Sequence, residues 1–116
     1  MPRTDVNIQT EVYCTLQFEA THAWGNCPFE EVEYLKYPHR HVFHIKAHKL
    51  VTHSDRDVEF IMLKHRIFKY LKDKYPTHAF GHQSCEMIAT DLLCEFHLSR
   101  CEVSEDNENG AIVKVV

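Results

Sequence analysis

The sequence predicts an α+β domain in which two strands, two helices and two further strands follow one another. Apolar and polar residues alternate with a period of two near both ends of the chain, which is typical of strands with one buried face. In the middle, apolar residues recur every three or four positions, which is typical of helices that pack on a sheet. We expect an antiparallel four-stranded sheet with both helices on one face, in a single domain over residues 1–116.

The first two strands are expected to be long and to pair as a hairpin. Over residues 12–22 the even-numbered positions are mostly apolar, and over residues 39–51 the apolar positions Phe43, Ile45 and Ala47 are odd-numbered. The loop between the strands is rich in Gly, Asn and Pro, and its acidic stretch near residue 30 can form a helical turn.

The two helices are expected over about residues 58–74 and from Ser84 to about His97. Ser54 or Asp55 is expected to cap the first helix, and Ser84 the second, because their side chains can accept hydrogen bonds from free backbone N–H groups. The residues expected to face the sheet are Phe60, Leu63, Ile67, Leu71, Ile88, Leu92 and Phe96.

The last two strands are expected at residues 100–105 and 111–116. The segment between them reads Asp-Asn-Glu-Asn-Gly, which is typical of a turn.

The composition argues against several classes of protein. The net charge is −4 with no block of like charge, so a basic surface for nucleic acid is not expected. No apolar run approaches the roughly 20 residues of a membrane span. The 5 cysteines include no Cys-x-x-Cys pair and the first residues are mostly polar, which favours reduced thiols in a cytoplasmic protein without a secretory leader.

Three of the 10 histidines are placed by the alternation at the ends of the apolar faces. The pattern of the first strand, continued past Ala20, reaches His22; the pattern of the second, continued back from Phe43, reaches His41 and His39. In a hairpin these strand ends lie side by side, so the imidazoles converge. Three His ligands with an open fourth position are typical of catalytic zinc. The alternative is that they are edge residues without a shared role.

Five short motifs, in order, resemble those of the 6-pyruvoyltetrahydropterin synthase and 6-carboxytetrahydropterin synthase family. They are F-E-A-T-H at 18–22, H-R-H at 39–41, E-F-I-M-L-K at 59–64, S-C-E at 84–86 and V-S-E at 103–105. The resemblance implies that family's tunnelling fold (T-fold), which has the ββααββ order. It also implies a homotrimer or homohexamer whose substrate pocket lies between subunits.

By this resemblance the protein would be a lyase that depends on Zn2+ and acts on 7,8-dihydroneopterin triphosphate or a related reduced pterin. The product would be a 6-substituted tetrahydropterin, of the kind used on the way to queuosine. His22, His39 and His41 would hold the zinc, and the Glu105 carboxylate would anchor the N–H edge of the pterin ring. The alternative for Glu105 is an ordinary turn residue.

The catalytic acid and base groups are where the sequence departs from the family pattern. Family members carry a Cys a few residues before H-x-H, whereas here Cys27 lies 12 residues and Glu33 lies 6 residues before His39. The family's L-D-H motif between the helices has no Asp-His counterpart, so His78 or His82 would have to transfer protons. All four candidates can equally be loop residues without a catalytic role. A catalytically impaired protein that binds a pterin or purine-like ligand, and a protein that serves assembly only, are therefore the competing functions.

Overall fold

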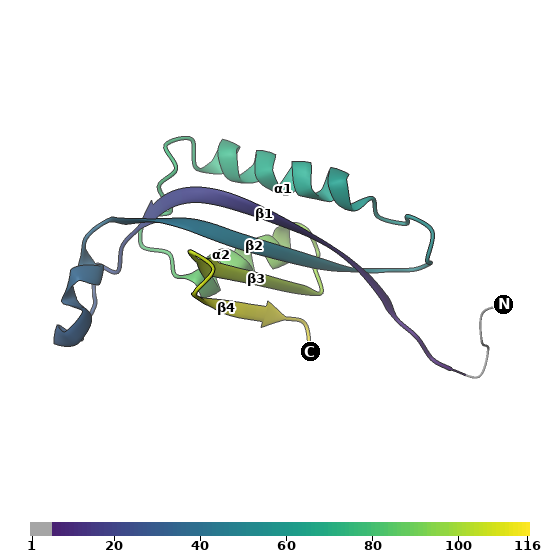
Figure 1. The fold of residues 1–116 in the computed structure, drawn as a ribbon, viewed down its shortest axis with the longest axis horizontal. Helices are drawn as coiled ribbons and strands as arrows, with labels where there is room; N and C mark the ends of the chain where they lie inside the picture. The colour runs from purple at the N-terminus through teal and green to yellow at the C-terminus, as the bar shows by residue number, and fades with distance from the viewer. Residues whose placement is uncertain (1–5) are drawn as a thin grey trace.

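The computed structural model describes residues 6–116 and shows a four-stranded antiparallel sheet with helices packed on it (Figure 1). The elements are β1 (Thr10–His22), the 3-10 helix η1 (Glu30–Lys36), β2 (His39–Val51), α1 (Phe60–Lys74), α2 (Cys85–Glu95), β3 (Arg100–Glu105) and β4 (Asn109–Lys114). In the sheet the strands lie in the order β1-β2-β3-β4, so β1 and β4 are its edges. The predicted α+β class and antiparallel four-stranded sheet are confirmed, and the acidic turn is present as η1.

The long hairpin of β1 and β2 determines which residues meet at its open end. The two strands pair without interruption from Thr10 opposite Val51 to His22 opposite His39. The bounds of β2 agree with those expected from the alternation, and β1 begins two residues earlier than residue 12. This register confirms the predicted juxtaposition of the strand ends, because His22 and His39 lie opposite one another.

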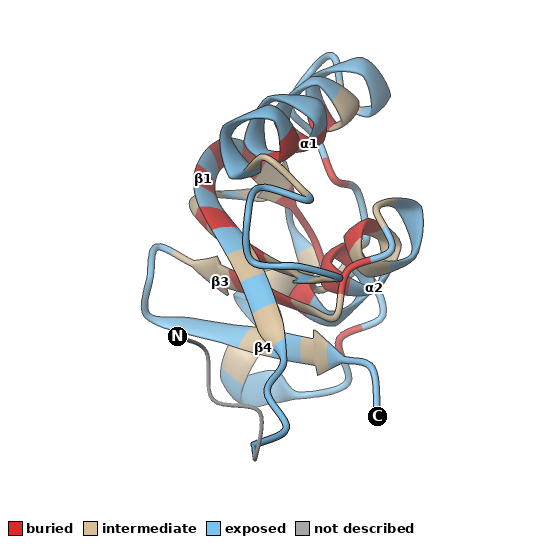
Figure 2. Cartoon of the chain, turned by 90° about the vertical axis from the view of Figure 1, so that its right-hand side faces the viewer, coloured by how far each residue is buried: buried red, intermediate tan, exposed pale blue. Residues whose placement is uncertain are grey.

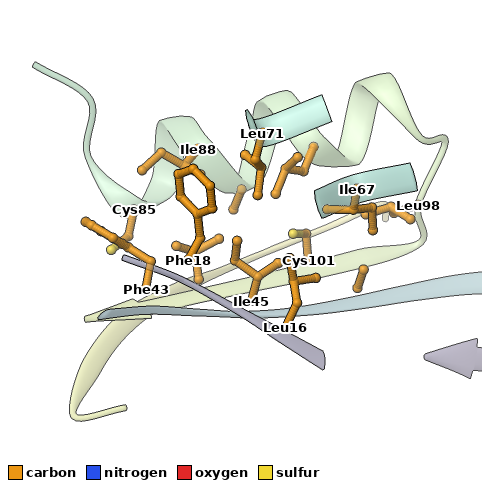
Figure 3. Packing of buried hydrophobic residues seen from close by; sticks show 14 of the residues in the cluster. Leu16, Phe18, Phe43, Ile45, Ile67, Leu71, Cys85, Ile88, Leu98 and Cys101 are labelled. Carbon is orange, nitrogen blue, oxygen red and sulfur yellow. The ribbon is translucent and has the colours of Figure 1, made fainter. Parts of the chain in front are cut away.

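The hydrophobic core lies between one face of the sheet and the two helices (Figures 2 and 3). Burying each large apolar side chain contributes about 1.5–3 kcal/mol, so this layer supplies most of the free energy that stabilises the fold. Its most buried large side chains are Phe18, Phe43, Ile45, Ile67, Leu71, Ile88, Leu92 and Val103.

The start of α1 differs from the expectation. Its N-cap is Glu59, whose carboxylate accepts a hydrogen bond from the Ile61 amide at 3.0 Å, so the assignment to Ser54 or Asp55 was wrong. A compact turn delays the helix, because Asp57 accepts hydrogen bonds from both the backbone and the hydroxyl of Thr52. Phe60 was also wrongly expected in the core. It is the first helical residue and is 49% exposed.

The bounds of α2 and β4 differ from the expected ones by about two residues. Ser84 caps α2 as predicted by accepting a hydrogen bond from the Met87 amide, but the helix ends at Glu95 rather than near His97. His97 has a φ of 52°, which a helix cannot continue through. Strand β4 covers Asn109–Lys114 rather than 111–116, because the turn before it is shorter than expected.

The connection between α1 and α2 is attached to the open end of the hairpin. Thr21 forms an isolated parallel bridge with Ala79, and the Ala23 amide donates a hydrogen bond to the Gly81 carbonyl at 2.9 Å. These contacts bring residues 78–84 beside the end of β1. Among residues 6–116, neither long helix combines the length and apolar character that a membrane-spanning helix requires.

Candidate metal centre

Three imidazoles and one carboxylate meet at the open end of the hairpin. His22, His39, His41 and Glu105 each offer one ligand atom, and these atoms all lie within 4.8 Å of one another. His22 and His39 are directly opposite in the β1–β2 register, and Glu105, the last residue of β3, lies opposite Phe43 of β2. His22 is buried and the other members are half-buried. These four residues, called the metal group below, can hold a metal ion.

Two of the imidazoles form hydrogen bonds to backbone carbonyls on their outer side. Nδ1 of His22 lies 2.8 Å from the carbonyl oxygen of Gln83, and Nδ1 of His39 lies 2.8 Å from that of Tyr37. A carbonyl oxygen only accepts hydrogen bonds, so each Nδ1 must carry the proton. In the neutral ring, Nε2 then presents a lone pair to the centre of the group.

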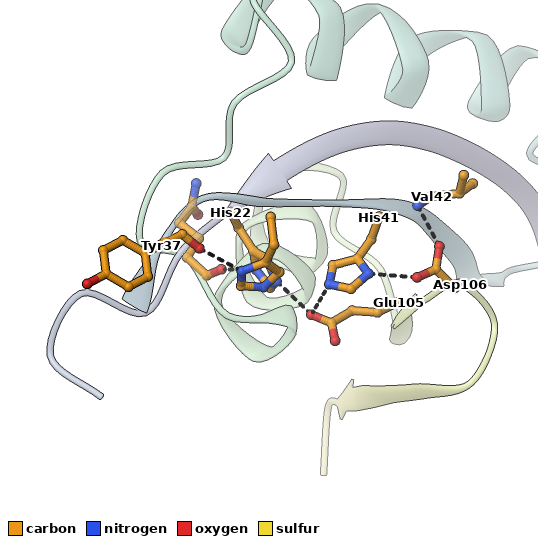
Figure 4. A network of polar contacts seen from close by, with 8 residues as sticks. His22, Tyr37, His41, Val42, Glu105 and Asp106 are labelled. Atoms are coloured by element: carbon orange, nitrogen blue, oxygen red, sulfur yellow. Dashed lines mark hydrogen bonds and ion pairs between the residues drawn. The ribbon is translucent and has the colours of Figure 1, made fainter. Parts of the chain in front are cut away.

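The third imidazole is held by a carboxylate instead. Nδ1 of His41 donates to Oδ2 of Asp106 at 2.6 Å (Figure 4), and Oδ1 of Asp106 accepts a hydrogen bond from the Val42 amide at 2.9 Å. These two hydrogen bonds lower the pKa of Asp106, which keeps its carboxylate ionised and accepting. His41 therefore also directs a lone pair on Nε2 inward.

The inner atoms of the group are electron-pair donors that lie close together. Oε2 of Glu105 lies 2.6 Å from Nε2 of His22 and 3.6 Å from Nε2 of His41. Nε2 of His22 is buried, and within residues 6–116 it has no partner with hydrogen-bond geometry. A lone pair facing a carboxylate at this distance is repulsive unless a cation, either a proton or a metal ion, lies between them. Three imidazole nitrogens and a carboxylate oxygen are a donor set that suits Zn2+.

Glu105 has a position that the sequence interpretation did not include. It was expected to anchor a ring, separate from the metal ligands, yet its carboxylate lies among the imidazoles. The strand parity that places it on the buried face is confirmed, since Cys101 and Val103 of the same strand are buried. The missing signal was the register between β2 and β3, which places Glu105 beside His41.

A cavity of about 490 Å³ opens beside the group. Its wall includes His22, His39 and Glu105, together with Trp24, His82, Cys85, Glu86 and Met87. Burial, with smaller contributions from the charges of Glu105 and Glu86, raises the pKa of Cys85 to about 12, so this thiol stays protonated at neutral pH. A larger hollow of about 870 Å³, with His44 and Lys46 in its wall, includes no member of the metal group.

Among the four proposed proton-transfer residues, His82 is the one that lines the smaller cavity. Nδ1 of His82 accepts a hydrogen bond from the Gly25 amide at 3.3 Å. A Cβ at Gly25 would lie 2.8 Å from Cε1 of this ring, so the imidazole packs directly on the backbone. With Nδ1 accepting, the neutral ring carries its proton on Nε2.

The other three candidates lie outside that cavity wall. The ring of His78 stacks on Phe18 with centroids 4.4 Å apart, and its Nδ1 bonds to a β1 carbonyl at 2.6 Å. Cys27 is buried, with Sγ 3.7 Å from two carbonyls of its own loop. Glu33 lies on the exposed side of η1 and pairs with Lys36 at 3.3 Å.

No family model matches this chain, and no curated protein matches it. The features that bear on function are therefore the metal group, the adjoining cavity and the sequence motifs that contribute their residues.

Proposed function

We propose that this protein is a zinc-dependent lyase of the 6-carboxytetrahydropterin synthase type, acting on 7,8-dihydroneopterin triphosphate or a related reduced pterin. The observation that carries the proposal is the convergence of three imidazoles, all hydrogen-bonded through Nδ1, with a carboxylate beside a cavity. The F-E-A-T-H, H-R-H and V-S-E motifs, which resemble those of the pterin synthase family, contribute these four residues.

The residues divide the chemistry between them. A zinc ion held by His22, His39 and His41 would polarise the hydroxyl and carbonyl oxygens of the substrate side chain. Glu105 is a member of the metal group and also lines the cavity. Its carboxylate can therefore accept hydrogen bonds from the N–H edge of a 2-amino-4-oxo pyrimidine ring. His82 lines the cavity and carries a proton on Nε2 in its neutral form, so we assign it the role of general acid and base.

A second candidate function is the binding of a pterin or purine-like ligand without turnover. One observation favours it. Within the described part of the chain, the cavity wall offers no reactive thiolate, because Cys27 lies outside it and burial keeps Cys85 protonated. On this alternative the metal group and Glu105 retain a ligand, and His82 does not transfer protons efficiently.

The proposal includes a T-fold homotrimer or homohexamer. Strands β1 and β4 are the edge strands of the sheet, and Ile112 of β4 is 55% exposed. Pairing of such edges between subunits would remove exposed backbone N–H and C=O groups. Light scattering should give the mass of three or six chains, and a monomer at micromolar concentration would reject this assembly.

The deciding experiment combines metal analysis with product analysis. The purified protein should contain zinc, and incubation with 7,8-dihydroneopterin triphosphate should give a 6-substituted tetrahydropterin detected by mass spectrometry. Zinc with pterin binding but no product would favour the binding protein. If neither zinc nor pterin is bound, both functions are rejected.

A further inference from the structure

The turn between β3 and β4 places a second carboxylate directly after Glu105. Asp106 and Asn107 both have positive φ angles, 54° and 59°, and the Glu108 amide donates to the Glu105 carbonyl at 3.0 Å. This is the geometry of a type I′ turn, in which Asp and Asn are tolerated because their short polar side chains suit positive φ. The positive φ explains why an Asp is tolerated at position 106. It does not determine the direction in which the carboxylate points.

The Asp106 carboxylate is held on β2 by contacts to both of its oxygens. Oδ2 accepts from Nδ1 of His41 at 2.6 Å, and Oδ1 accepts from the Val42 amide at 2.9 Å (Figure 4). The Asp106 amide in turn donates to the Val42 carbonyl at 2.8 Å. Three hydrogen bonds to consecutive residues of one strand leave this side chain little freedom to turn away.

His41 differs in this respect from the other two imidazoles. His22 and His39 are oriented by neutral backbone carbonyls, whose positions follow from the path of the chain. His41 is oriented by a charged side chain. If Asp106 did not accept the Nδ1 proton, the proton could move to Nε2, which lies 3.6 Å from Oε2 of Glu105. The proton would then occupy the Nε2 lone pair that a metal ion must share.

We propose that Asp106 is a positioning residue that holds His41 as the Nδ1–H tautomer with Nε2 directed at the metal. The inference rests on the metal site of the proposed function and adds a residue to it. A carboxylate bonded to the outer nitrogen of a ligating imidazole orients the ring and raises its basicity, and losing such a partner typically lowers metal affinity by about 10–100-fold. Glu105 and Asp106 thus act on the same imidazole from its two sides.

The test compares two matched substitutions. Asp106→Asn keeps the tolerance of positive φ and an oxygen for the Val42 amide, but removes the charge facing His41. Glu102→Gln makes the same chemical change at His48, where Nε2 and Oε2 are 2.9 Å apart. In competition with a chromophoric zinc chelator, Asp106→Asn should bind Zn2+ about 10–100-fold more weakly than the wild type, and Glu102→Gln should be unchanged.

A second measurement separates positioning from a purely structural role. Long-range 1H–15N NMR of the metal-free protein at mildly alkaline pH reports which nitrogen of His41 carries the proton. The proton should be on Nδ1 in the wild type and should shift towards Nε2 in Asp106→Asn, while the backbone amide spectrum stays folded. A wild-type proton on Nε2 would overturn the proposal, whether or not the variant folds. Unchanged tautomer and zinc affinity in a folded Asp106→Asn would also overturn it.

The two measurements also separate this inference from the metal site. If the wild type binds no Zn2+, the proposed function fails. The NMR measurement still decides the role of Asp106, since a proton fixed on Nδ1 by Asp106 supports the positioning role, and an Nε2 proton rejects it.

Discussion

Strands β2 and β3 form two histidine–carboxylate clusters, and the two are built differently. In the first, Nε2 of His48 lies 2.9 Å from Oε2 of Glu102, and the same oxygen lies 3.5 Å from Nε of Arg100. In the second, His41 and Glu105 approach through the same atom types, but His41 has already bonded its Nδ1 to Asp106. The first contact is an ordinary hydrogen bond in which the imidazole donates. The second directs a lone pair at a carboxylate.

This difference shows what separates a candidate metal ligand from an ordinary histidine near an acid. Proximity to a carboxylate is common to both clusters. The distinguishing feature is a hydrogen-bond acceptor on the outer nitrogen, which leaves the inner nitrogen without a proton. All three imidazoles of the metal group have such an acceptor.

The largest effect is expected when one imidazole is removed from the metal group. His39→Ala should lose bound zinc on dialysis, because a direct ligand contributes more affinity than the 10–100-fold typical of an outer partner. His48→Ala removes the same side chain from the other cluster and should retain zinc. Metal analysis of both variants makes the comparison, and equal zinc content would show that the clusters do not differ in this way.

The next effect concerns turnover. His82→Ala should lower kcat by about 10²–10⁴-fold, as is typical for loss of a general acid or base, without changing the zinc content. His65, which is exposed on α1, provides the control, and His65→Ala should leave kcat unchanged. Gly25→Ala, whose added Cβ would press on the His82 ring, should give a smaller decrease in kcat. Full activity in His82→Ala would remove this residue from the proposed chemistry.

A more moderate effect is expected when the charge of Glu105 is removed. Glu105→Gln should weaken pterin binding roughly ten- to hundredfold, because an amide N–H would face a ring N–H. Zinc affinity should also fall, since the carboxylate lies 2.6 Å from Nε2 of His22. Calorimetric titrations with zinc and with pterin measure both, and Glu102→Gln is the matched control. Unchanged binding in Glu105→Gln would make it a turn residue only.

The smallest expected effect is on the pH dependence of stability and comes from two buried cysteines near the clusters. Burial is the main reason that the pKa values of Cys85 and Cys101 are raised to about 12; the charge of Glu105 adds to the first and that of Glu102 to the second. The unfolded thiols ionise nearer the ordinary value of 9.0. The unfolded state therefore binds fewer protons above about pH 9, and the free energy of unfolding should decrease as pH rises.

Denaturant titrations between neutral and alkaline pH measure this decrease. Cys85→Ala and Cys101→Ala should each make it shallower, because each removes one thiol that ionises in the unfolded state alone. A decrease as steep as in the wild type would show that these thiols ionise in the folded protein as well.

The sequence alone was sufficient for the hairpin and its histidines. A period of two is a local property, so it assigned faces along β1 and β2 without any knowledge of their partners. His22, His39 and His41 could therefore be predicted to meet. The Ser84 cap was predictable for the same reason, since a cap depends on the few residues that follow it.

The remaining features depended on contacts between segments far apart in the chain. Strand β3 is separated from β2 by both helices, so its register is set by how α1 and α2 pack on the sheet and not by a short turn. That register places Glu105 among the imidazoles and Asp106 on the outer nitrogen of His41. The position of His82 likewise depends on the bridge between Thr21 and Ala79. Periodicity determined which residues share a face, whereas tertiary packing decided which atoms meet, because hydrogen bonds between distant segments leave no local pattern in a sequence.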